Sequence, residues 1–196
     1  MILLLLAVVT ASTTHGQEFY GKIGGGIMKP YAAVSGPKGS TRYDVQLVGL
    51  IETGIRIRNN DISAQGMFTR LKIVSDDAYY IEKYNKPHVV YLGNPMTVLT
   101  ARYNLHILKL IYVGASGGIV IFSSMHDNIA TKAGDEASNY IRGRGWTIGL
   151  QTGANIPISH RLFINGEASY KRLVATSGYW GRNNAFIFLI GAGIKI

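Results

Sequence analysis

Residues 43–58 alternate between apolar and polar side chains, and this alternation constrains the fold more than any other feature of the chain. The odd positions are apolar or small: Val45, Leu47, Gly49, Ile51, Thr53, Ile55 and Ile57. The even positions include the polar residues Asp44, Gln46, Glu52, Arg56 and Arg58. A period of two indicates a β-strand, and it extends well beyond the ~5–6 residues of a typical soluble strand. The segment matches the ~9–11 residues with which a tilted strand crosses a bilayer.

The stretch that begins at Ala185 and ends at Ile196 is a second alternating strand, and it continues to the last residue. Its even positions are all apolar: Phe186, Phe188, Ile190, Ala192, Ile194 and Ile196. Exposed apolar edges promote aggregation, so we expect this strand to pair on both sides and to face lipid. It therefore predicts the closing strand of a transmembrane β-barrel, paired with the strand that contains the glycines at 24–26. Lys195 is expected on the lumen side.

Six further segments have the character of strands: residues 19–31, 63–75, 96–103, 108–122, 139–155 and 161–172. Tight turns are expected at 59–61, 104–107 and 156–160, whereas the other connections, including a plain loop at 34–42, are longer. This order predicts an all-β, eight-stranded antiparallel up-and-down transmembrane β-barrel with four long extracellular loops. In residues 63–75, Met67, Thr69, Leu71 and Ile73 are expected to face lipid. A β-bulge is expected near 143–145.

Residues 1–16 are expected to be a signal peptide, because residues 2–9 form an apolar core followed by small and polar residues. This core is too short to cross a bilayer as a helix. Residues 17–196 then form one outer-membrane β-barrel domain. After the signal, no stretch of about 18 apolar residues follows.

A secreted, lipocalin-like barrel is the structural alternative, in which the apolar side chains would face inward around a ligand. Aromatic residues near the strand ends favour the membrane, since they predict a girdle at each interface. The girdle residues are Tyr31, Tyr43, Tyr91, Tyr140, Tyr170, Tyr179 and Trp180 at one rim, and Phe19 and Tyr103 at the other. Charged residues make up only 16% of the chain, below the ~25% of ordinary soluble domains.

Four segments carry a resemblance to a known family: residues 17–26, 101–104, 112–118 and 191–196. They resemble the small eight-stranded outer-membrane barrels, in particular the Bacteroidetes-type outer-membrane β-barrel domain, an OmpA/OmpX-like barrel of the porin family. The resemblance implies a location in the bacterial outer membrane. It also implies that the terminal strand is read by the outer-membrane assembly machinery. Members of the family are porin-like, adhesion-related or secretion-associated, so the resemblance leaves the function open.

The inward set of the expected barrel is charged, and its members are Lys22, Asp44, Glu52, Arg56, Arg70, Lys72, Arg102, Glu167, Lys171 and Lys195. An eight-stranded barrel has a lumen that side chains fill. Because buried charges must be paired, Glu52 and Glu167 are expected to pair with arginines in a structural network. The alternative is a narrow ion path, which the excess of basic residues would make anion-favouring.

Three functions follow in order of preference: a non-enzymatic scaffold whose loops serve surface interaction or envelope integrity, a narrow porin or export component, and a lipid-A-modifying hydrolase. The hydrolase hypothesis rests on Asp76, Asp77 and the segment 123–127, which contains Ser123, Ser124, His126 and Asp127. We expect these to be solvated loop groups. No catalytic, cofactor-binding or metal-binding residue is expected, since the chain has no Cys and His88, His106 and His160 are isolated in the sequence.

The net charge of +9 predicts contact with membrane lipid and lipopolysaccharide. Nucleic acid is not expected as a partner, because the basic residues are spread along strands and form no stripe. The extracellular ligand of the loops is left open.

Overall fold

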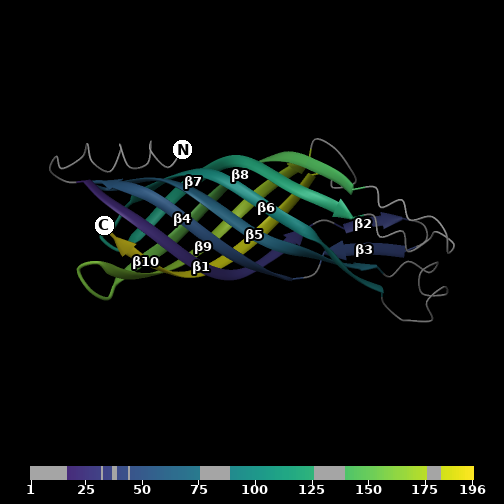
Figure 1. The fold of residues 1–196 in the computed structure, drawn as a ribbon, viewed down its shortest axis with the longest axis horizontal. Coiled ribbons are helices and arrows are strands. Elements are labelled where there is room, and N and C mark those ends of the chain that lie inside the picture. Colours follow the sequence, from purple (N-terminus) through teal and green to yellow (C-terminus); the bar gives the residue numbers. More distant parts are fainter. Residues whose placement is uncertain are drawn as a thin grey trace.

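A closed barrel of antiparallel strands forms the body of the protein in this computed structural model (Figure 1). The structure describes residues 17–31, 33–36, 39–43, 45–75, 89–125, 140–175 and 182–196. The expected signal peptide lies outside these residues. The eight barrel strands are β1 (Gln17–Tyr31), β4 (Gln46–Ile57), β5 (Asn60–Ser75), β6 (Val89–His106), β7 (Ile111–Met125), β8 (Tyr140–Pro157), β9 (Leu162–Ala175) and β10 (Arg182–Lys195).

The strands follow the order β5-β4-β1-β10-β9-β8-β7-β6, and pairing of β5 with β6 closes the sheet on itself. The two ends of the chain meet as expected, because β1 pairs with β10 from Tyr20 opposite Lys195 to Tyr31 opposite Asn184. The eight-stranded up-and-down barrel is therefore confirmed. The described residues contain no helix long and apolar enough to cross a membrane.

One expected loop contains additional strands. The segment 34–42 carries a hairpin of β2 (Ala33–Gly36) and β3 (Gly39–Tyr43), and β3 pairs with β5 from Thr41 opposite Ser75 to Tyr43 opposite Ile73. The expectation of a plain loop was wrong there. The composition of the segment 34–42 predicts turns. The hairpin forms instead because the end of β5 extends beyond the barrel wall and offers a free edge. In Figure 1 this hairpin projects beyond the end of the barrel that is opposite the C-terminus.

Short connections lie at the other end, beside the C-terminus. They span residues 58–59, 107–110 and 158–161, each within a few residues of its expected position. Arg58 takes a left-handed conformation with φ of 55°, which a two-residue hairpin turn accommodates. The expectation of a β-bulge near 143–145 was wrong, since the β7–β8 register runs without a shift. A register shift occurs instead between Arg70 and Lys72, where β5 pairs with β6.

The outer face of the barrel is apolar. Leu47, Ile190 and Leu150 are 81%, 72% and 67% exposed, and the even positions from Phe186 in β10 to Ile196 just beyond it are all exposed on this face. A large contiguous apolar surface is not stable in water, but it is the required lipid-facing band of a transmembrane barrel. A soluble barrel would place this set inside, so the lipocalin-like alternative is excluded.

The described aromatic residues of the expected girdle lie on this outer face. Tyr31 and Tyr170 both pack against Phe186, with ring centroids 5.4 and 5.0 Å apart. Tyr103 is exposed near the short-turn end, and its hydroxyl donates to Asn60 Oδ1 at 2.6 Å. The side chains of Tyr43, Tyr91, Tyr140, Tyr179 and Trp180 lie outside the described residues.

Glycine at position 26 is required by the close approach of β1 to β10. A Cβ at Gly26 would overlap the carbonyl oxygen of Phe188, and one at Gly24 would meet that of Ile190. Both glycines occupy inward-facing positions of β1, between the inward residues Lys22 and Met28. Glycine therefore lets the two strand backbones approach closely at these positions.

The variant Gly26→Ala is expected to lose ~1–3 kcal/mol of unfolding free energy, because the methyl group must displace β10 backbone. Gly21→Ala is the matched control, since a Cβ there has nothing within 4 Å. Urea titration followed by the heat-dependent gel shift of a folded barrel measures both. Equal stability of the two variants would contradict the role of Gly26 in closure.

Candidate functional site

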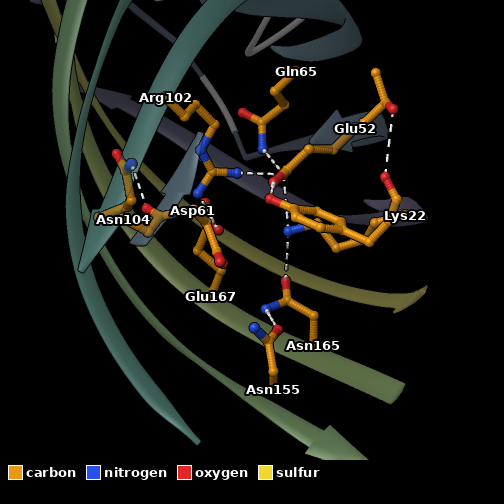
Figure 2. A network of polar contacts seen from close by, with 12 residues as sticks. Lys22, Glu52, Asp61, Gln65, Arg102, Asn104, Asn155, Asn165 and Glu167 are labelled. Carbon is orange, nitrogen blue, oxygen red and sulfur yellow. Dashed lines mark hydrogen bonds and ion pairs between the residues drawn. The ribbon is translucent and has the colours of Figure 1, made fainter. Parts of the chain in front are cut away.

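Glu52 lies at the centre of a polar network in the lumen (Figure 2). Its carboxylate is 2.8 Å from Lys22 Nζ and also contacts the Arg102 guanidinium. Tyr20 Oη and Gln65 Nε2 each donate to it at 3.1 Å. Side chains of β1, β5 and β6 thus converge on one buried carboxylate of β4, which is 2% exposed. A buried charge requires this degree of compensation.

Arg102 joins Glu52 to the second buried carboxylate, Glu167. Its Nη1 contacts Glu52 and its Nη2 contacts Glu167, so one guanidinium bridges β4 and β9 across the lumen. Tyr112 Oη donates to the same Glu167 oxygen at 2.7 Å. The guanidinium suits this position because it is planar and presents several donors in a fixed geometry.

Amide and hydroxyl side chains connect this ion network to the wall. Asn165, which is fully buried, accepts from Lys22 Nζ at 3.2 Å. Its amide nitrogen lies 3.0 Å from Tyr112 Oη and 2.8 Å from Asn155 Oδ1. Lys171 lies apart from the carboxylates and donates to Ser116 Oγ at 2.9 Å.

A second cluster lies closer to the short turns and contains His106. Its Nε2 is 2.8 Å from Asp61 Oδ2 and 3.0 Å from Arg56 Nη2, and Arg56 Nε is 2.7 Å from Asp61 Oδ1. The expectation that His106 is isolated was therefore wrong. Asp61 and His106 are 45 residues apart in the sequence and meet because β5 pairs with β6.

A small polar cavity opens below these clusters at the short-turn end. Its volume is about 80 Å³, and Tyr20, Lys22, Glu52, Asp61 and Lys195 are among its lining residues. That volume holds a few water molecules. At its mouth Lys195 Nζ is 3.0 Å from Glu18 in a solvent-exposed pair.

The other half of the lumen is apolar. Buried side chains of seven barrel strands form one layer: Met28, Val48, Leu50, Met67, Met96, Val98, Val120, Leu173, Ala185, Ile187 and Leu189. The lumen therefore consists of a polar layer toward the short turns and this mainly apolar layer toward the β2–β3 hairpin, in which Lys171 is buried opposite Ala185 and Thr147 opposite Leu173. The charged inward set of the sequence describes mainly the first of the two.

Of the residues predicted to form the lumen network, the structure brings Glu52, Arg102 and Glu167 together. Arg56 lies near the mouth of the small cavity, where it pairs with Asp61. Lys171 is buried in the lumen without contacting either glutamate. The inward placement of Arg70 was wrong, since its side chain is exposed on the outer face. The side chains of Asp44 and Lys72 lie outside the described residues.

Strand β5 explains this error. Its inward set is Asp61, Ser63, Gln65, Met67 and Thr69, and its outward set includes Phe68 and Arg70. Because Met67 is apolar, the sequence pattern assigned it to the lipid face. In this half of the barrel, however, the inward and the outward side chains are both apolar. The parity of the polar residues nearer the turn, Asp61 and Gln65, is the signal that assigns the faces correctly.

Sequence reasoning also missed Tyr20, Gln65, Tyr112 and Asn165 as network members. Tyr112 lies in a strand whose faces were ambiguous because nearly all of its residues are apolar or glycine. The alternation of Tyr112, Gly114 and Ser116 would have marked the inward face. Tyrosine inside the lumen is not predicted by the girdle rule, which assigns tyrosine to the interfaces.

The residues of the hydrolase hypothesis are only partly described. Asp76, Asp77, His126 and Asp127 lie outside the described residues, and Ser123 and Ser124 belong to β7. Among the histidine, aspartate and glutamate side chains that the structure describes, no three gather in a way that could hold a metal ion.

Solved structures share this fold at low sequence identity. Neisserial surface protein A matches with a TM-score of 0.57 and 12% identity, over 93% of this chain and 100% of that chain. Ail of Yersinia pestis, solved with the heparin analogue sucrose octasulfate, matches at 0.55 and 10%, over 92% and 99%. OprG of Pseudomonas aeruginosa matches at 0.51 and 8%, over 92% and 96%.

The chain therefore has the fold of the small eight-stranded outer-membrane barrels. No family model and no curated protein matches the sequence. The expected OmpA/OmpX-like fold is confirmed, and the Bacteroidetes detail stays a prediction.

The variant Arg102→Met is expected to lose about 3–5 kcal/mol of unfolding free energy, because it leaves two buried carboxylates without their shared cation. Lys195→Met removes a cation from the exposed pair with Glu18 and should cost only about 0–1 kcal/mol. Urea titration of both variants measures the difference. A loss for Arg102→Met as small as that of the control would show that the network does not hold the lumen together.

Proposed function

We propose that this protein is a non-enzymatic, non-conducting outer-membrane scaffold, in which a sealed barrel holds the connections at the hairpin end for surface interaction or envelope integrity. The observation that carries the proposal is the filled lumen. The apolar layer and the Glu52–Arg102–Glu167 bridge lie one above the other along the barrel axis. An ion entering the polar layer would still have to cross the apolar layer.

The energetics of the apolar layer support this reading. Met28, Met96 and Ile187 are each no more than 2% exposed, so an ion on this path would meet closely packed apolar side chains. Moving an ion through a hydrocarbon environment is strongly unfavourable, and apolar constrictions close pores by dewetting. A narrow porin is the alternative, and the excess of basic residues in the inward set predicted from the sequence is a feature that favours it.

The fold itself is compatible with ligand binding by this kind of scaffold. Ail, which shares the fold, was solved with a heparin analogue. A barrel of this size can therefore present a ligand site. For this chain the ligand of the connections is unassigned, and the closing strand β10 is the segment we propose for contact with the outer-membrane assembly machinery.

Planar-bilayer recordings test the sealed lumen. The purified protein is expected to give no steady single-channel steps, because an ion would have to cross the apolar layer. The same preparation must show heat-dependent migration on a gel, so that a silent trace comes from a folded barrel. Reproducible conductance steps would contradict the proposal and favour the porin.

Mass spectrometry of lipid A tests the enzymatic alternative. Lipid A from cells with and without the protein is expected to have the same acylation pattern, since we assign no catalytic role to the segment 123–127. A deacylated product that disappears in the His126→Ala variant would instead establish the hydrolase.

A further inference from the structure

The small polar cavity at the short-turn end contains one cation without a partner. The other charged residues that line it form three ion pairs: Lys22 with Glu52, Arg56 with Asp61, and Lys195 with Glu18. Lys109 also lines the cavity, and its ammonium forms no ion pair within the described part of the chain. An anion that enters the cavity therefore meets a free cation, whereas a cation would find every lining carboxylate already paired.

Lys195 supplies a second ammonium group at the mouth. Its pair with Glu18 is solvent-exposed, with Nζ 3.0 Å from the carboxylate oxygen, and exposed pairs of this kind are weak. An ammonium group carries three donors. Lys195 can therefore donate to an incoming anion while it stays in contact with Glu18.

Both lysines project from backbone that is tied to a neighbouring strand. Lys109 lies in the turn 107–110, where the Leu110 carbonyl accepts a hydrogen bond of 2.8 Å from Asn155 N of β8. Lys195 N donates to the Arg161 carbonyl at 2.7 Å. A site whose backbone is fixed in advance loses less entropy when a ligand binds.

One wall of the cavity is apolar and consists of Leu110, Pro157 and Phe163. Pro157 is directly opposite Phe163 in the β8–β9 pair, and the bond from Asn155 holds Leu110 beside β8. An inorganic ion gains nothing from such a wall, whereas a short hydrocarbon group is removed from water there. The volume of about 80 Å³ has room for a few water molecules, so the bound group has only a few non-hydrogen atoms.

We propose that this cavity binds a carboxylate with a short apolar substituent. The carboxylate contacts the ammonium groups of Lys109 and Lys195, and the substituent packs against Leu110, Pro157 and Phe163. The same chemistry is offered by a free short-chain organic acid and by the C-terminal end of a peptide. Either source would reach the site from the side of the membrane that the short turns face, which is the periplasm in the predicted topology.

The buried carboxylates determine how deeply the ligand enters. Glu52 and Asp61 are each 2% exposed and repel a second negative charge. The ligand carboxylate therefore stays at the mouth, and the site is a closed-ended pocket and not part of an ion path.

Solution NMR of the full ¹⁵N-labelled protein in zwitterionic detergent micelles tests the site, with sodium propionate as the probe at constant ionic strength. We expect saturable shifts of the Leu110 and Lys195 amides with a Kd on the order of millimolar, because a ligand of so few atoms gains little binding energy. Propionamide has nearly the same shape without the charge, and it should bind at least about threefold more weakly.

Lys109→Gln is expected to lower the affinity for propionate about three- to fivefold, which is the scale of one exposed ion pair, and to leave the binding of propionamide unchanged. Arg161→Gln is the matched control, because Arg161 is an exposed cation of another short turn and does not line the cavity. It should bind propionate as the wild type does. Equal loss in the two variants, equal binding of propionate and propionamide, or absence of saturable shifts would each overturn the proposal.

N-acetyl-trialanine and its C-terminal amide separate the two sources of the carboxylate. Tighter binding of the acid form than of propionate, lost in the amide, supports a peptide end as the ligand. Binding of propionate with no shift from either peptide supports a free acid. None of these measurements bears on whether the lumen conducts, so the sealed scaffold and the carboxylate site fail separately.

Discussion

Hydrocarbon offers no hydrogen bonds, and this single constraint determines most of the structure. Every backbone N–H and C=O at membrane depth must find a partner within the sheet, so β1 and β10 have to meet and the sheet has to close. Closure with eight strands leaves a lumen that only side chains can fill. The inward residues must then satisfy one another, which explains why Arg102 serves two glutamates at once. The outward residues are largely released from this requirement and are mostly apolar.

The sequence predicts the barrel well because closure and lipid exposure leave regular traces in it. The alternation of residues 43–58 and 185–196 assigned both faces of β4 and β10 correctly. The two carboxylates Glu52 and Glu167 were recognisable because a charge at an inward position needs a partner. Which cation joins them was not recognisable, since several arginines share the inward pattern and only the register of the strands places Arg102 between them.

The prediction failed where the two faces of the wall have the same polarity. In the apolar layer, Met67 and Phe68 are equally apolar, although one is 2% and the other 45% exposed. Periodicity carries no information there, and Arg70 was assigned to the lumen as a result. An outward basic residue costs roughly 0–1 kcal/mol near the membrane interface, against about 2–4 kcal/mol at the bilayer midplane. A basic residue facing lipid is therefore tolerable only near an interface.

The pairing of β1 with β10 also sets the order of events during assembly. Tyr20 and Lys195 are opposite each other in the barrel but 175 residues apart along the chain (195 − 20). In every other pair of neighbouring barrel strands, the second strand follows the first along the chain, with only the β2–β3 hairpin between β1 and β4. Those pairs can form early, whereas the β1–β10 pair cannot form before β10 is present. Until then two long apolar edges stay unpaired, in the state most prone to aggregation. The strand that closes the barrel is thus the one that removes both exposed edges at once.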